Sequence, residues 1–403
     1  MRNRSWRRPL CLSGFILFLQ AFPIPSSVRE AATVQWVSGF TMHYPLWHVV
    51  WTPFCGIADV LTVLSYHQVI VFGVWAIVLL LAIGGFRRFL PCFFLLLLFL
   101  AWGGLVPRPM GRLVAKDSDI LLIDFHSHTQ ISHDGRPSFS PAANMAWHQN
   151  QGYNAAFITD HNRTEAASWA KEDSKHDWKE TGYRSLEGEE ISLSQTHLVL
   201  LGNHEVVDNK PYDSDKSKIP LFLADMTKKG LPVVASLPEY WWYHWGDDIQ
   251  SFVRWGISGF EIINSAPKAL DFPLSKRLEI VDLCRRQNLF MTGISDNHGY
   301  GYATAVWNAM RIPGWQSMDP DALENAVLKT LKTKRFEAVQ VLERTHFLPE
   351  NPFELVVTPV CSLWIYARGL QPLQALSWII WIWTIYFLYP SRRSGTQRSG
   401  PKP

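Results

Sequence analysis

The sequence predicts an α/β domain, built on a parallel sheet or barrel, that is inserted between transmembrane helices. Two observations predict this arrangement. From about residue 108 to about residue 344, apolar runs of strand length alternate with helical stretches, and repeated strand–helix units form parallel sheets or barrels. On both sides of that region the chain contains long apolar runs with almost no charge, and a membrane-spanning helix needs roughly 20 such residues.

Three transmembrane helices are predicted at 10–24, 67–86 and 89–106, within a membrane region that covers residues 1–114. Arginines precede the first run, which is also short enough to be the core of a signal peptide. The other two runs are apolar on every side, which favours a membrane over a buried pair of soluble helices. A pair of arginines separates them, so we expect a helical hairpin with a short basic turn.

The soluble domain is predicted between residues 115 and 345. After it, residues 346–370 are expected to be extended. Residues 371–390 contain several tryptophans and no charge, which indicates a last transmembrane helix. Residues 391–403 form a polar tail that is expected to be disordered. The strands expected within the domain are Ile120–Phe125, Ala155–Thr159, His197–Leu201, Pro232–Ala235, Phe260–Ile263 and Leu289–Ile294, and the helices are Pro141–Gln151, Lys276–Gln287 and Pro320–Leu331.

The distribution of arginines predicts the topology. Positive residues concentrate on the cytoplasmic side of a membrane, and arginines lie before the first helix, in the hairpin turn and after the last helix. Four helices then place the domain in the periplasm or elsewhere outside the cytoplasm. A fifth helix within 40–60 would invert this placement. The sequence therefore predicts a multi-pass integral membrane protein in contact with a lipid bilayer.

Composition limits the possible functions. The formal net charge is +3 over 403 residues, which gives no basis for bulk binding of nucleic acid. The five cysteines are scattered and never spaced as C-x-x-C. A disulfide framework or a zinc-thiolate site is therefore not expected.

Histidines and carboxylates gather at the ends of the predicted strands. His126 and His128 follow an apolar run, and residues two apart in a strand project to the same side. Chemistry in such folds is placed at the carboxyl ends of parallel strands, and imidazole and carboxylate ligands suit Zn, Mn or Fe. The further candidates flanking apolar runs are Asp134, Asp160, His161, Glu190, His197, Asp296 and His298.

The order of these motifs resembles the PHP domain, the polymerase and histidinol phosphatase family. The resemblance covers about residues 115–345 and implies a distorted (β/α)7 barrel, two or three divalent ions (Zn, Mn or Fe) and hydrolysis of a phosphoester. It rests on Asp-Phe-His126-Ser-His128-Thr with Asp134-Gly135, on Thr-Asp160-His161-Asn, on Gly188-Glu-Glu190-Ile-Ser, on His197 before Leu-Val-Leu-Leu-Gly, and on Ser-Asp296-Asn-His298-Gly.

The resemblance also implies individual roles. The implied metal ligands are His126, His128, a bridging Glu190 and Asp296 for the first ion, His197 for the second, and Asp134, His161 and His298 for the third. Asp160 would orient a neighbouring imidazole. A metal-bound hydroxide would attack the phosphorus, and His298 or Asp134 would assist proton transfer.

One position departs from the family pattern. Where Ala-His-Pro is usual, this chain has Ala235-Ser236-Leu237, so the second metal lacks one ligand. Either Glu239 or His244 replaces it, or the site holds two ions, or the second ion is weakly bound. His244 is equally open to being a surface residue in an aromatic loop.

Two further residues carry alternative readings. Arg163 is either a ligand for a substrate phosphate, through its planar guanidinium, or a partner in a surface salt bridge. Glu261 corresponds to a family position near the site, and a structural role is open for it.

The leading hypothesis is a membrane-anchored, metal-dependent phosphoesterase. The alternatives are a PHP-type nuclease and a non-catalytic metal-binding sensor or assembly protein, the last motivated by the missing histidine.

Overall fold

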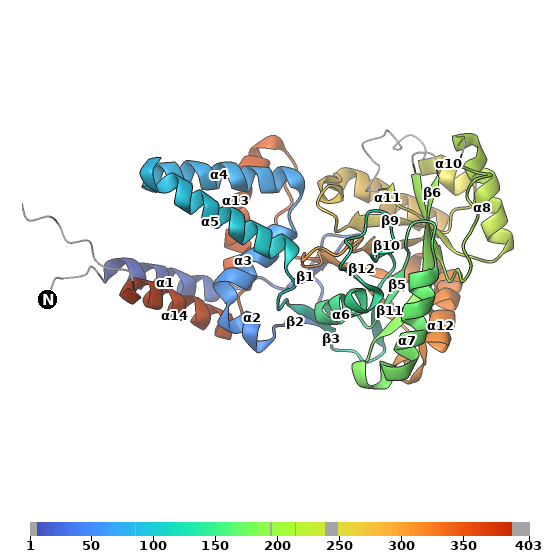
Figure 1. The fold of residues 1–403 in the computed structure, drawn as a ribbon, viewed down its shortest axis with the longest axis horizontal. Coiled ribbons are helices and arrows are strands. Elements are labelled where there is room, and N and C mark those ends of the chain that lie inside the picture. Colours follow the sequence, from blue (N-terminus) through green and yellow to red (C-terminus); the bar gives the residue numbers. More distant parts are fainter. Residues whose placement is uncertain (1–5, 85, 194–195, 214, 238–248, 389–403) are drawn as a thin grey trace, which may run out of the picture.

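A computed structural model of the chain describes residues 6–84, 86–193, 196–213, 215–237 and 249–388. It has a helical part and an α/β part that lie side by side along the long axis of the molecule (Figure 1). The α/β part is built on a ten-stranded sheet. The helical part combines segments from both ends of the chain, with α1 (Arg7–Gln20) packed along α14 (Pro372–Leu388).

The sheet is mixed and has the strand order β1-β12-β11-β4-β5-β6-β7-β8-β9-β10. The strand bounds in that order are Val28–Glu30, Gln340–Arg344, Val306–Arg311, Ile120–Asp124, Ala155–Ile158, Arg184–Leu193, Thr196–Leu201, Val233–Ala235, Gly259–Asn264 and Phe290–Ile294. Each of the six strands expected from the sequence lies in this sheet. Pairing is parallel for β4–β5, β5–β6, β8–β9 and β9–β10, and antiparallel around β7 and around β11.

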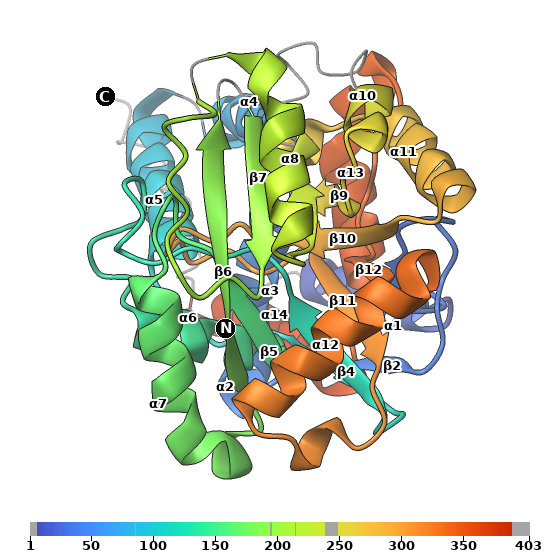
Figure 2. The ribbon, with the colours of Figure 1, turned by 90° about the vertical axis from the view of Figure 1, so that its right-hand side faces the viewer.

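The predicted (β/α)7 barrel between transmembrane helices is therefore wrong, because the structure has a curled mixed sheet of ten strands (Figure 2). Two connections explain the difference. Only two residues separate β6 from β7, and a parallel crossover needs a dozen residues or more, so these strands form an antiparallel pair. Strand β11 follows β10 without an intervening helix and pairs antiparallel with both β12 and β4.

Side-chain and backbone hydrogen bonds bring the end of β10 to β4 across β11. The Asn308 amide oxygen accepts from the Gly293 backbone N–H at 2.8 Å, and its amide nitrogen donates to Gly293 O at 2.6 Å and to Ile123 O at 2.9 Å. Just beyond the strand ends, the Asp296 N–H donates to His126 O at 3.0 Å. The loops that follow β4 and β10 are thereby held together, and both carry candidate ligands.

Helices α6, α7, α8, α10, α11 and α12 surround the sheet. Their starts follow local rules: Ser140 caps α6 by accepting from the Ala143 N–H, and Asp319 caps α12 by accepting from the Ala322 N–H. Proline occupies the first turn of both helices, where its missing N–H costs nothing. The bounds are Pro141–Gln151, Glu165–Thr181, Ile219–Lys228, Ile249–Arg254, Leu274–Gln287 and Pro320–Lys334.

The helical part corrects the membrane prediction. Helices do form where they were predicted, but among the described residues no single helix has both the length and the apolar composition needed to cross a membrane. One pair, α13 (Pro352–Gly369) and α14, passes that test together, and the two helices are bent by 116°. The predictions of transmembrane helices, a multi-pass membrane protein and an extracytoplasmic domain are therefore not supported. The remaining helices are α2 (Leu46–Val50), α3 (Thr52–Thr62), α4 (Tyr66–Gly84) and α5 (Phe86–Leu105).

Two boundary predictions also change. Residues 346–370 were expected to be extended, but most of them form α13, because Asn351 caps that helix by accepting from the Glu354 N–H at 3.0 Å and Pro352 starts it. The N-terminal region is not separate from the domain, since β1 pairs with β12 in the main sheet. A second, two-stranded sheet joins β2 (Phe40–His43) to β3 (Arg112–Ala115). The predicted tail 391–403 lies outside the described residues.

Glu343 in β12 is a buried carboxylate between two arginines. Its Oε2 lies 3.0 Å from Arg29 Nε and 3.1 Å from Arg277 Nη1. Burial raises the pKa of Glu343, but the charges of Arg277, His346 and Arg29 outweigh burial and lower this pKa to about 2.

Glu343 should therefore stabilise the fold in a pH-dependent way. Because its folded pKa is below its ordinary value of 4.5, the stabilisation is complete above pH 4.5 and is lost as the pH falls toward 2. We expect the difference in unfolding free energy between wild type and Glu343→Gln to shrink by about 2 kcal/mol between pH 7 and pH 3. Urea unfolding at both pH values measures this, with the exposed Glu279→Gln as control. An equal difference at both pH values would contradict the expectation.

Candidate metal centre

Four side chains from three parts of the sheet converge at the ends of β4, β6 and β10. Glu190 Oε2, from β6, lies 3.1 Å from His126 Nε2 and 3.2 Å from His128 Nε2. Asp296 Oδ1, from the loop after β10, lies 3.1 Å from His128 Nε2. The four residues are at most 5% exposed. The structure thus brings together the set that the sequence assigned to a first ion.

Glu190 also contacts the ligands expected for the other ions. Its Oε1 lies 2.7 Å from His197 Nδ1 in β7, and its Oε2 lies 3.1 Å from His161 Nδ1 beyond β5. One buried carboxylate therefore faces four imidazoles. This is the arrangement expected of a carboxylate that bridges two ions.

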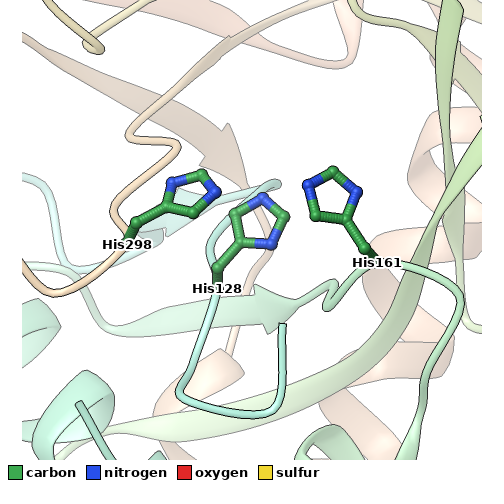
Figure 3. Close-up of side chains that lie close together, drawn as sticks. All are labelled: His128, His161 and His298. Atoms are coloured by element: carbon green, nitrogen blue, oxygen red, sulfur yellow. The ribbon is translucent and has the colours of Figure 1, made fainter. Parts of the chain in front are cut away.

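Asp134 and His298 complete the group at its open side. Asp134 Oδ2 lies 3.2 Å from His298 Nε2 and 3.4 Å from His161 Nε2. Figure 3 shows the rings of His128, His161 and His298 next to one another, and the first and last of these stack with centroids 4.0 Å apart. The Asp134 side chain is 45% exposed, so solvent reaches the centre from this side.

The donor set fits divalent metal ions. Both carboxylate oxygens of Glu190 and Nε2 of His298 are buried without a hydrogen-bond partner among the residues described. A buried ionised group without hydrogen bonds is costly unless it is paired or binds a metal. Imidazole nitrogens and carboxylate oxygens are the ligands that Zn, Mn and Fe share, and overlapping triads of these side chains lie close enough to hold an ion.

The imidazoles around Glu190 keep its carboxylate ionised. Burial raises the pKa of Glu190, but the charges of His126, His197 and His161 outweigh it and hold that pKa well below its ordinary value. Burial lowers the pKa of His126, but Glu190 and Glu261 raise it well above the ordinary value. Because imidazole must be neutral to bind a metal, metal uptake here would release protons.

Glu261, whose role the sequence left open, supports the centre from behind. Its Oε1 lies 2.8 Å from His126 Nδ1, and its Oε2 accepts a hydrogen bond from Ser236 Oγ at 2.6 Å. Such a contact fixes the orientation of a ligating ring. Ser236 stands where a histidine was expected, and its hydroxyl positions Glu261. Glu239 and His244, the proposed replacements, lie outside the described residues.

Asp160 departs from its predicted role, whereas Arg163 takes one of the two roles that the sequence left open. Asp160 does not orient an imidazole: it accepts hydrogen bonds from the Thr129 N–H at 2.6 Å and the Thr129 hydroxyl at 2.7 Å, and so fixes the loop that follows His128. The Arg163 side chain is exposed and lies 3.1 Å from Glu165 Oε1, which is the surface salt bridge.

Sequence reasoning missed a buried pair beneath the centre. Asp124 Oδ2 lies 3.0 Å from His148 Nε2, and Asp124 Oδ1 accepts from the Ser295 N–H at 3.1 Å. The pair links β4, α6 and the loop after β10. Asp124 at the end of an apolar run was the available signal, but nothing in the sequence indicated His148 as its partner.

No protein-family model matches the chain, and no curated protein matches it in sequence. Solved structures with a similar fold include a provisionally assigned metal-dependent phosphoesterase from Bifidobacterium adolescentis (17% identity, TM-score 0.33, covering 45% of this chain and 89% of that one). PsfC from Pseudomonas syringae has 17% identity and a TM-score of 0.36, covering 62% and 99%. An amidohydrolase from Chromobacterium violaceum, with bound sulfate and no metal, has 14% identity and a TM-score of 0.33, covering 55% and 98%. Identities and TM-scores this low assign no family to the chain.

Proposed function

We propose that this chain is a metal-dependent hydrolase that acts on phosphoesters. The observation that carries the proposal is Glu190, a buried carboxylate whose two oxygens lie within 3.1 Å of His126, His161 and His197 nitrogens and make no hydrogen bond with the described residues. A bridging carboxylate among imidazoles is suited to holding two or more divalent ions.

Most of the side chains in the centre would bind metal ions. His126, His128, Glu190 and Asp296 would hold one ion, and His161 and His197 would extend the site to a second. Ions bound there would supply Lewis acidity toward the phosphoryl oxygens and lower the pKa of a water molecule.

Proton transfer would fall to Asp134 and His298. Asp134 is the more exposed of the two, and its Oδ2 is 3.2 Å from His298 Nε2. Burial raises the pKa of Asp134, but hydrogen bonds from His161 and His298 outweigh it and hold that pKa below its ordinary value. Ionised Asp134 can therefore orient His298 toward a substrate, and His298 can protonate the leaving oxygen.

A cavity of about 320 Å³ opens beside these residues. Its walls include Asp134, Asp296 and His298, and beyond them the stacked rings of Tyr300 and Tyr302, 5.4 Å apart. Lys268 also lines it. The cavity supports a small organic phosphoester as substrate, with its organic group against the tyrosines.

The first test combines metal content with turnover. The purified chain, loaded separately with Mn, Zn or Fe, should hydrolyse p-nitrophenyl phosphate or its diester. The double substitution His126→Ala with His128→Ala removes two ligands of the same ion, so it should abolish both metal uptake and turnover. Elemental analysis and a colorimetric assay measure the two quantities, and the exposed His176→Ala on α7 serves as control.

The two outcomes separate the hypotheses. Turnover that survives in the double variant would rule out the metal mechanism. Stoichiometric metal binding by the wild-type chain, without hydrolysis of any phosphoester in a broad panel, would instead favour the non-catalytic metal-binding alternative.

A further inference from the structure

A second cavity, of about 80 Å³, lies between the helical part and the end of β12, away from the metal centre. Arg344 borders it from β12, and Ser362 and Ile365 border it from α13. Much of the remaining lining is aliphatic and includes Val63 and Leu370. A water molecule requires about 10–15 Å³ of such volume, so the space is large enough for a small organic molecule.

Two buried polar groups that line this cavity have no partner. Arg344 is 9% exposed and donates from Nε to Thr304 O at 3.0 Å, but its Nη2 is buried without a hydrogen-bond partner among the described residues. The hydroxyl of Ser362, which is 4% exposed, is likewise buried and unpartnered. Each such group is costly to leave unsatisfied. Both residues line the same cavity, so an acceptor bound there can be offered hydrogen bonds from β12 and from α13.

The guanidinium of Arg344 forms no ion pair with the carboxylates near it. Asp59 borders the same cavity, but its carboxylate is already held by Arg108, at 2.8 Å, and by His48, at 3.1 Å. Glu343 is taken by two other arginines. No carboxylate of the described chain lies within ion-pair distance of Arg344. A buried guanidinium without an anionic partner is energetically unfavourable, and an anion in the cavity would supply one.

We propose that this cavity binds a small aliphatic carboxylate. The planar guanidinium of Arg344 matches the two oxygens of a carboxylate, and the Ser362 hydroxyl can donate a further hydrogen bond. Val63, Ile365 and Leu370 offer an apolar surface for a short hydrocarbon chain. A bound carboxylate would connect β12 to α13 and so stabilise the contact between the two parts of the molecule.

Calorimetric titration of the full chain with sodium butyrate tests the proposal. Butyrate should bind once per chain and raise the melting temperature, and Arg344→Met should weaken the binding at least tenfold. Arg311→Met, which removes an exposed arginine from the neighbouring strand, should leave it unchanged. Butyramide has the shape of butyrate without its charge and should bind at least tenfold more weakly.

Equal binding of butyrate and butyramide, or unchanged binding in Arg344→Met, would overturn the proposal. Tighter binding of inorganic phosphate than of butyrate would do the same. If butyrate did not bind at all, the cavity would hold only water and the proposal would be wrong. Because Arg344 also packs on Trp307, Ser362→Ala is a second variant that removes only a hydroxyl. It should bind butyrate several-fold more weakly, and unchanged affinity there would also count against the site.

Discussion

Glu190→Gln should remove most of the metal binding and with it the hydrolysis. The substitution keeps the size of the side chain but removes the charge that four imidazoles face, of which His197 at 2.7 Å is the nearest. Even residues that only orient a metal ligand cost about 10–100-fold when changed, so losing the bridging carboxylate should reduce turnover more than about 100-fold. Elemental analysis and competition with a chelator measure metal binding alongside the assay.

The adjacent glutamate provides a matched control. Glu189 is equally buried but projects to the other face of β6, where it accepts from Asn203 Nδ2 at 2.6 Å and from the Val207 N–H at 3.0 Å. Burial raises its pKa to about 7, so Glu189 is about half ionised at pH 7 and Glu189→Gln removes less negative charge than Glu190→Gln. This variant should keep its metal. A Glu190→Gln protein with the wild-type metal content would refute the bridging role.

Lys171→Met should cause the largest loss of stability. Lys171 Nζ lies 3.0 Å from Glu187 Oε2, from Glu324 Oε1 and from Asp321 Oδ1. The lysine and the two glutamates are nearly inaccessible to solvent. Methionine is of similar size but removes the ammonium that the two glutamates share, and the half-exposed His204 is the positive partner that stays beside them. Breaking a buried ion pair typically costs about 3–5 kcal/mol. Urea unfolding at pH 7 measures the loss.

A second lysine on the same helix is the control. Lys175 contacts Asp321 at 2.9 Å and Glu172 at 3.1 Å, and these carboxylates are more than half exposed. Exposed ion pairs contribute about 0–1 kcal/mol, so Lys175→Met should have a small effect. Equal losses of unfolding free energy in the two variants would show that the buried contacts of Lys171 stabilise the fold no more than an exposed ion pair. Neither variant should change the metal content.

The local sequence was sufficient to predict six strands of the main sheet and the polar residues near their ends, but not β1, β6, β11 and β12. Each of the six predicted strands forms, but β4 ends at Asp124, so the H-x-H pair lies in the loop after the strand, where both imidazoles reach Glu190. The structure also brings together the eight residues proposed as metal ligands. Strand periodicity and chain order carried this information, because both depend only on neighbouring residues.

Contacts between distant segments could not be predicted in the same way. Ser236 and Glu261 act as a unit behind His126, and Asp124 finds His148 across 24 positions. Each of these side chains alone has the character of an ordinary core or surface residue. Their roles depend on which strands are neighbours, and that order was not available from the sequence.

The sequence by itself determined where the polar residues of a metal centre stand: beside apolar strands, in an order that pairs histidines with carboxylates. Only the tertiary structure decided that Glu190 faces four imidazoles, that Glu261 fixes His126, and that the strands form a mixed ten-stranded sheet. Within the described residues, it also decided that no single helix is both long enough and apolar enough to cross a membrane. The physical reason is that propensity and periodicity act over a few residues, whereas burial, pairing and charge compensation depend on the packed chain.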